Sequence, residues 1–415
     1  MNLKRGISMK KILVLLTILV LTMFSGCTLE QREQAVEPQV QAPSQINLAS
    51  DLSAFTIGYV GPLTGDVASI GVPMKETVEM VVNDLNVNGG INGRMLHVIY
   101  EDGRCNSKDA VNAAQKLMNV NKVEVIIGGT CSPEVLGMAP MAEQVGVVMI
   151  SPSATNPSIK ESGDYVFRVV PSDNGQAKET ADLFAAEEFK RVAVIYINND
   201  WGVGLKNAFE SSFEGNIVAT ENFDVDGADF KTQLSKIKAM KPDVLYMMSF
   251  PKQAGIIIKQ SMELGLDVPI YAADGAKDDS IIPFVESLDQ DFFVILPGVP
   301  DSPELEQFAS SYFEEFGKEY NAYTPESYDV ANIVIQALGN TDGSADAVKD
   351  YLYSMGEFKG VSGTFEFDLF GEVEKPYDVF TVENGKFVKV RASGNLITGM
   401  VGFDGIFSFF KGIFS

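Results

Sequence analysis

Short apolar segments alternate with segments of helical periodicity along most of this chain. Residues 55–60 form a short apolar run, and residues 71–86 then carry Val78, Val81, Val82 and Leu85 at spacings near those of one helix face. Strands separated by helices of this length indicate βαβ units, because parallel strands need a long crossover connection. The alternation therefore favours parallel sheets that are covered by helices.

The alternation occurs in two successive blocks, which predicts two domains of similar construction. The predicted strands span residues 55–60, 96–100, 123–127, 147–150, 191–196, 217–223, 244–248 and 269–271. The predicted helices span 71–86, 109–119, 204–213, 230–240 and 252–264, with a further helical stretch at 140–144. We expect an α/β fold with two doubly wound, Rossmann-like lobes. Ligands of such folds bind at the carboxyl ends of the strands, so the expected site is a cleft between the lobes.

Composition supports folded lobes and argues against one class of partner. Hydrophobic residues make up 46% of the 415 residues, which suits a globular protein with large cores. The chain has 56 acidic and 32 basic residues, and its net charge of −24 argues against nucleic acid, because phosphate contacts need clustered Lys and Arg. The single histidine, His97, lies in a strand-like segment, and no P-loop or nucleophile–base pair is evident. We therefore expect neither an enzyme nor a bound cofactor or metal.

The first 26 residues have the pattern of a secretory signal peptide. A basic head precedes the stretch from Ile12 to Phe24, which is apolar apart from two threonines. This stretch is too short for a comfortable membrane span and is typical of a signal-peptide core. It ends in Phe24-Ser-Gly-Cys27, which resembles a lipobox, in which the cysteine is lipidated and becomes the new N-terminus. An ordinary signal peptide cleaved elsewhere is the alternative.

We expect residues 27–53 to be a lipid-anchored tether. Residues 28–50 are rich in Gln, Glu, Pro and Ala and poor in aromatics, a composition that cannot bury enough apolar surface to fold. Removal of residues 1–26 would remove four basic and no acidic residues and leave 389 residues with a net charge of −28. The expected location is extracytoplasmic, with lipidated Cys27 on the outer face of the cell membrane.

The other two cysteines fit the same compartment. If Cys27 carries lipid, Cys105 and Cys131 remain, and a disulfide between them is the default in an exported protein. Closing a loop of this size is worth roughly 3 kcal/mol in the chain-entropy model. Two buried free thiols are the alternative.

Polar and aromatic side chains follow several predicted strands. They are Ser132, Ser153, Thr155, Trp201, Phe250 and Asp274. The three hydroxyls precede helical stretches, where backbone N–H groups and the helix dipole bind carboxylates. Taken singly, hydroxyls at such places are also typical of helix N-caps, and large aromatics are typical of a core. Together the six side chains suit a free amino acid zwitterion with an apolar side chain.

An ordered set of motifs over about residues 55–391 resembles the substrate-binding proteins of branched-chain amino-acid ABC transporters. This leucine/isoleucine/valine-binding-protein family has the type I periplasmic-binding-protein fold. The motifs are IGYVGPLTG at 57–65, NGGING at 88–93, Asp102 to Cys105, IGGTCS at 127–132, ISPSAT at 150–155, GQ at 175–176, WGVG at 201–204, YD at 328–329 and GTFEFD at 363–368.

The resemblance implies a role for each candidate residue. The ligand carboxylate would be held at Ser132, Ser153 and Thr155, the ammonium at Asp274, and the side chain by Trp201, Phe250 and Ile70. Asp274 stands where Glu is commoner, so its carboxylate lies one methylene farther back. Trp201 and Phe250 stand where leucine-type binders have Tyr, so a hydroxyl is lost at Phe250. The family disulfide pairs the positions of Cys105 and Cys131.

The resemblance also implies the division into lobes. The chain would cross between them near Pro171, Pro297 and Val361. The expected ranges are 54–171 and 298–361 for lobe 1, 172–297 and 362–392 for lobe 2, and 393–415 for a C-terminal amphipathic tail. That tail has an apolar helical face from Phe403 to Phe414, which either packs on its own lobe or contacts a membrane or a partner.

The expected function is capture of an amino acid, branched-chain or otherwise apolar, by a monomeric lipoprotein. It would deliver the amino acid to the permease subunits of an ABC transporter. The alternative is a sensory receptor, or a binding protein for amides or short organic acids, on the same fold.

Overall fold

The computed structural model describes residues 54–392 of the chain. The predicted signal peptide, the tether with Cys27 and the tail at 393–415 lie outside the described residues. Among residues 54–392, no helix is both long enough and apolar enough to cross a membrane.

The first sheet has five parallel strands in the order β2-β1-β3-β4-β5. They are β1 (Phe55–Gly61), β2 (Leu96–Asp102), β3 (Val125–Gly128), β4 (Val148–Ser151) and β5 (Val166–Arg168). β3 and β4 are buried throughout and read VIIG and VMIS. Such continuous apolar runs are expected for parallel strands that are covered on both faces.

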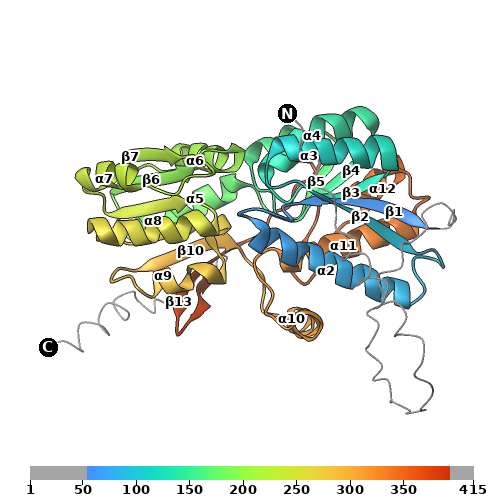
Figure 1. Ribbon diagram of the computed structural model, residues 1–415. Helices are drawn as coiled ribbons and strands as arrows, with labels where there is room; N and C mark the ends of the chain where they lie inside the picture. Colours follow the sequence, from blue (N-terminus) through green and yellow to red (C-terminus); the bar gives the residue numbers. More distant parts are fainter. Residues whose placement is uncertain (1–53, 393–415) are drawn as a thin grey trace, which may run out of the picture. The chain divides into compact units, whose positions relative to one another are not determined.

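Helices cover both faces of this sheet (Figure 1). They are α2 (Ala68–Val87), α3 (Ser107–Gln115) with its π-helical extension Lys116–Asn121, α4 (Ser132–Val145), α11 (Thr324–Asn340) and α12 (Ala345–Ser354). Helices α3 and α4 pack against each other on one side, and α2 and α11 pack together on the other. Each pair closes its own apolar core, one around Val78 and Val334 and the other around Ala113 and Val135.

The second sheet has seven strands in the order β14-β13-β10-β9-β8-β6-β7. They are β6 (Arg191–Ile197), β7 (Asn216–Phe223), β8 (Val244–Met248), β9 (Ile270–Ala273), β10 (Phe292–Pro297), β13 (Tyr377–Glu383) and β14 (Lys386–Ala392). Strands β6 to β10 are parallel, whereas β13 and β14 add antiparallel to the edge at β10. The helices of this lobe are α5 (Asp173–Ala186), α6 (Asp200–Ser212), α7 (Lys231–Ala239), α8 (Pro251–Leu264) and the short α9 (Ile282–Val285).

The chain passes between the two sheets three times. It enters the second sheet after β5, and after β10 it returns through α10 (Pro303–Phe316) to α11, which packs on α2. A small antiparallel pair, β11 (Phe358–Gly360) and β12 (Gly363–Phe365), precedes the final passage to β13. The predicted α/β fold with two doubly wound lobes joined by three crossovers is confirmed.

Among the helices that begin earlier than their apolar pattern predicts, α4 and α6 matter for the positions of polar and aromatic residues. Helix α6 begins at Asp200 because the Asn199 side chain caps it, accepting the N–H of Gly202 at 2.8 Å. Trp201 therefore lies in the first turn of a helix and not in the loop before it. Helix α4 begins at Ser132, well before the predicted stretch at 140–144. Its internal Gly137 and Pro140 interrupt the apolar spacing, but both are tolerated in a packed helix.

Candidate ligand-binding site

A pocket lies at the carboxyl ends of the strands and is lined by residues of both lobes. Its lining residues are Pro62, Val67, Ile70, Thr130, Cys131, Ser132, Ser153, Thr155, Trp201, Phe250, Asp274, Gly275 and Tyr323. All seven residues predicted as ligand contacts are in this set. The structure thus brings them together from loops and helices separated by up to two hundred residues of sequence.

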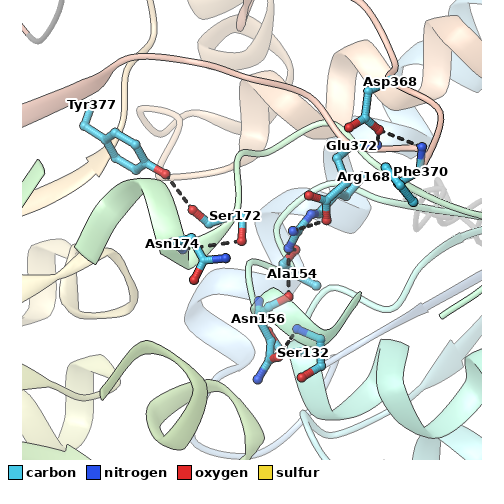
Figure 2. A network of polar contacts seen from close by, with 11 residues as sticks. Ser132, Ala154, Asn156, Arg168, Ser172, Asn174, Asp368, Phe370, Glu372 and Tyr377 are labelled. Atoms are coloured by element: carbon cyan, nitrogen blue, oxygen red, sulfur yellow. Dashed lines mark hydrogen bonds and ion pairs between the residues drawn. The ribbon is translucent and has the colours of Figure 1, made fainter. Parts of the chain in front are cut away.

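The lobe 1 side of the pocket is polar. Ser132 is the first residue of α4, so its side chain and the positive end of the helix dipole lie at the pocket. Its Oγ accepts the N–H of Asn156 at 3.2 Å, which ties α4 to the loop after β4 (Figure 2). Ser153 Oγ donates to the Thr130 carbonyl at 2.5 Å, so the two hydroxyl-bearing loops are joined. A helix N-terminus held beside hydroxyls is a suitable receptor for a carboxylate.

A disulfide and a buried glutamate hold this receptor in place. Cys105 and Cys131 are bonded, as the sequence predicts. Glu134 accepts the backbone N–H groups of Cys105 at 2.9 Å, Thr130 at 2.9 Å and Cys131 at 3.0 Å. Burial raises the pKa of Glu134 to about 7, although these hydrogen bonds oppose the shift. The sequence reasoning missed Glu134, and its signal is an acid three residues after a helix cap.

The lobe 2 side of the pocket is largely aromatic. The rings of Trp201 and Phe250 stack with centroids 5.1 Å apart and planes 18° apart. Gly275 lies against this stack, because a Cβ placed there would be 2.6 Å from the Trp201 ring. Ile70 and Val67 of lobe 1 complete the apolar lining. This surface suits an aliphatic or aromatic side chain of a ligand.

Asp274 supplies the acid of the pocket. It is 4% exposed and follows β9 directly. Tyr323 donates its hydroxyl to Oδ2, whereas Oδ1 has no hydrogen-bond partner among the described residues. Burial raises the pKa of Asp274, and the Tyr323 hydroxyl opposes the rise. The free oxygen is the atom that a cationic ligand group can occupy.

Tyr323 is a second pocket residue that the sequence reasoning missed. It precedes α11 and has a left-handed backbone with φ of 66°. Its burial and the neighbouring Asp274 hold the pKa of its hydroxyl well above the ordinary value, so the hydroxyl remains a donor. The available signal was weak, a tyrosine in a turn before Thr324-Pro325, because it follows no predicted strand.

Known proteins resemble this chain over most of its length. A "Leucine-, isoleucine-, valine-, threonine-, and alanine-binding protein" of Pseudomonas aeruginosa is 26% identical over 344 residues, which cover 81% of this chain and 90% of that protein. The branched-chain amino acid transporter substrate binding protein LivJ of Streptococcus pneumoniae, solved with isoleucine, is 25% identical with a TM-score of 0.75. That match covers 82% of this chain and 99% of LivJ.

A more distant structure shares the fold alone. A solute-binding protein of an ABC transporter from R. palustris, solved with benzoate, is 19% identical with a TM-score of 0.74, and the match covers 82% of this chain and 96% of that one. The family model described as "Periplasmic binding protein" matches residues 54–386, nearly all of the described chain. The fold agrees with this match. It has two lobes built on largely parallel sheets, three crossovers and a pocket lined by residues of both lobes. The chain therefore belongs to the periplasmic binding protein family.

Proposed function

We propose that this protein captures a free amino acid with a branched-chain or other apolar side chain and delivers it to the permease of an ABC transporter. One observation carries the proposal. A buried acid with one unpartnered oxygen, Asp274, lines the same pocket as the hydroxyls of Ser132, Ser153 and Thr155. The remaining lining is mainly apolar. The pocket therefore has an acid, a group of hydroxyls and an apolar wall, which match the ammonium, the carboxylate and the side chain of such a ligand.

Each part of the ligand has its own receptor. The ammonium would pair with Asp274 Oδ1, because a charged partner offsets the cost of burying this acid. The carboxylate would bind the hydroxyls at the N-terminus of α4, where the helix dipole favours a negative charge. The side chain would lie between the Trp201–Phe250 stack and Ile70. Two names support this assignment. The Pseudomonas aeruginosa relative is called a binding protein for leucine, isoleucine, valine, threonine and alanine, and LivJ was solved with isoleucine.

A short aromatic acid, as in the benzoate-bound structure, would use only part of this site. Its carboxylate would fit the hydroxyl side and its ring the aromatic wall. It would leave Asp274 buried without a cationic partner, a loss of about 1–3 kcal/mol or more for a charged group. The structure therefore favours an amino acid over an organic acid.

The single tryptophan of the chain permits a direct test. Because Trp201 lines the pocket, its fluorescence reports on binding there. We expect L-leucine, L-isoleucine or L-valine to change this fluorescence and to raise the melting temperature, since a ligand that binds only the folded state stabilises it. Benzoate and the amide of leucine are the comparison ligands. Binding of benzoate with no response to any α-amino acid would contradict the proposal.

We also propose an anchor at Cys27 and lobes made of residues 54–171 with 298–361 and of 172–297 with β13 and β14. The expected start of the last lobe 2 segment at 362 is too early, because Phe365, Phe367 and Val373 pack in the core of the first lobe. Export and lipidation would place the protein on the outer face of the cell membrane. There, a monomer tethered by residues 27–53 can reach the permease. The support is the sequence pattern of residues 1–27. Labelled fatty acid should be incorporated into the wild-type chain and not into Cys27→Ser. Labelling of both chains would contradict the anchor and leave the ligand assignment intact.

A further inference from the structure

Arg168 is a charged side chain buried behind the hydroxyl side of the pocket. It is the last residue of β5 and has no exposed surface. Its Nη1 donates to the carbonyls of Ala154 at 3.3 Å and Asn156 at 3.0 Å (Figure 2). These two residues flank Thr155, which lines the pocket. The guanidinium therefore holds the pocket loop on both sides of a residue that is proposed to contact the ligand.

Three consecutive carbonyl groups of this loop accept donors from other segments. Between the two bonds from Arg168, the carbonyl of Thr155 accepts the backbone N–H of Asp173 at 2.8 Å. Ala154, Thr155 and Asn156 are each at most 4% exposed, so water has little access to replace a lost donor. With these carbonyls engaged, the backbone of the loop is fixed and the Thr155 side chain stays at the pocket.

Asn156 extends this arrangement to the other lobe. Its backbone N–H donates to Ser132 Oγ at 3.2 Å, and its Nδ2 donates to the carbonyl of Asp200 at 2.5 Å. Asp200 is the first residue of α6 and precedes Trp201, which lines the lobe 2 side of the pocket. Arg168 thus fixes the residue that joins the hydroxyls of lobe 1 to the aromatic wall of lobe 2.

A turn before β13 holds Arg168 in place. Glu372 forms an ion pair with its guanidinium, and the carbonyl of Gly371 accepts its backbone N–H at 3.0 Å. The turn is itself closed by Asp368, whose Oδ1 accepts the backbone N–H groups of Phe370 at 2.8 Å and Glu372 at 3.0 Å (Figure 2). The guanidinium is therefore fixed by an acid on one side and donates to the pocket loop on the other.

We propose that Arg168 is a positioning residue for ligand binding, which acts through Thr155 and Asn156. Its fixed donors hold the Thr155 hydroxyl where the ligand carboxylate binds, and they hold Asn156 against lobe 2. The inference rests on the proposed function, because Thr155 is assigned there to the carboxylate. A buried ion pair often contributes little net stability compared with apolar residues of similar volume. The effect of this pair is therefore expected in binding, because a loop that is held before the ligand arrives costs less entropy to order.

The first test measures L-leucine affinity through Trp201 fluorescence in Arg168→Met. This variant loses both bonds to the loop carbonyls, so affinity should fall about tenfold. Arg191→Met is the matched control and should bind like the wild type. Arg191 also donates to two backbone carbonyls, those of Lys241 at 3.0 Å and Met240 at 2.5 Å, but it begins β6, at the end of the strand away from the pocket. An equal loss in both variants would overturn the positioning role.

The second test separates positioning from stability. Arg168→Met alone leaves Glu372 largely buried without its partner, which destabilises the fold. The double variant Arg168→Met/Glu372→Met removes both charges and fills their space with apolar side chains. Its melting temperature should be close to that of the wild type, whereas its L-leucine affinity should still be about tenfold lower. Wild-type affinity in the double variant would overturn the inference.

Arg168→Lys separates geometry from charge. Lysine keeps the positive charge beside Glu372, but its single nitrogen does not reproduce the forked donors of the guanidinium. Its affinity for L-leucine should therefore stay about fivefold below that of the wild type. Full recovery of affinity would show that charge alone is required, and the role assigned to the two carbonyl bonds would be wrong.

The two proposals fail in different ways. If L-leucine and the other amino acids do not bind the wild type, the proposed function fails. The emission of Trp201 without ligand then still tests Arg168. It should change in the double variant, because Asn156 bonds to the residue before Trp201, and it should not change in Arg191→Met. If L-leucine binds the wild type and the double variant equally well, the inference is wrong and the proposed function stands.

Discussion

The position of Trp201 depends on the absence of a side chain at Gly275. A Cβ at this glycine would lie 2.6 Å from the ring and 3.1 Å from the next ring atom. Contacts this short require one of the two groups to move. Gly275 lies two residues after the end of β9, so its backbone is held in place and the indole must shift. The glycine therefore aligns the aromatic wall with the acid.

We expect Gly275→Ala to weaken amino-acid binding about tenfold with a smaller loss of stability, because overpacking displaces the ring toward the pocket. The fluorescence of Trp201 without ligand should change as well. Gly339→Ala is the control, since a Cβ there meets only Ile91 at an ordinary 3.5 Å. Equal affinities of Gly275→Ala and the wild type would show that the ring does not contact the ligand.

Single residues differ in how readily the sequence reveals them. Asp274 and Phe250 come directly after predicted strands, where the fold class places its ligands. Tyr323 comes at a helix start that follows no strand, so no local pattern indicates it. Its importance arises from its hydrogen bond to Asp274, and that contact joins segments far apart in the sequence.

At the scale of elements, the predicted strands match the structure more closely than the predicted helix starts, whereas β5 and β10 to β14 were not predicted. The strand β8 matches its prediction at both ends. Its five residues are all buried and apolar and have polar residues on either side, so the apolar run defines both ends of the strand. The start of α4 was missed, since it is set by Cys131, Pro133 and Glu134 and not by apolar spacing. A cap satisfies individual backbone N–H groups at the end of a helix. The spacing of apolar residues along the helix therefore does not indicate where the cap lies.

Helix α4 illustrates what a cap does for a site. Glu134 binds three backbone N–H groups around the disulfide, so the chain segment before the helix has one conformation. Ser132, the first residue of α4, is thereby held at the pocket before a ligand arrives. Preorganised donors of this kind lower the entropic cost of binding.

At the scale of the whole molecule, polar contacts join the lobes around the pocket. Lys252 of α8 pairs with Asp66, which precedes α2, at an Nζ–Oδ2 distance of 2.8 Å. Asn156 Nδ2 donates to the carbonyl of Asp200 at the start of α6 at 2.5 Å. With the bond between Tyr323 and Asp274, these contacts hold the lobes together. A ligand that adds contacts to both lobes favours the same arrangement.

We expect Lys252→Met to weaken amino-acid binding by up to about fivefold at low salt, the range of a partly exposed ion pair, mainly through faster dissociation. The difference should disappear at high salt, because screening removes the wild-type advantage. Stopped-flow fluorescence of Trp201 measures both rates. Lys178→Met is the control, since Lys178 pairs with Asp182 within one helix. A similar loss in both variants, or none at low salt, would exclude a role for the Asp66 pair in closure.

The sequence by itself determined the two α/β lobes and the pocket residues that follow strands, because alternating strands and helices favour parallel sheets and place strand-end residues at one edge. Ile70 came from the family resemblance, and the cysteine pair came from the export signal and the same resemblance. The tertiary structure alone decided that Tyr323 donates its hydroxyl to one oxygen of Asp274 and that Glu134 accepts the backbone N–H groups of the disulfide segment. Burial, and with it the charge that an acid can carry, depends on which distant segments pack around it, and no local pattern encodes that.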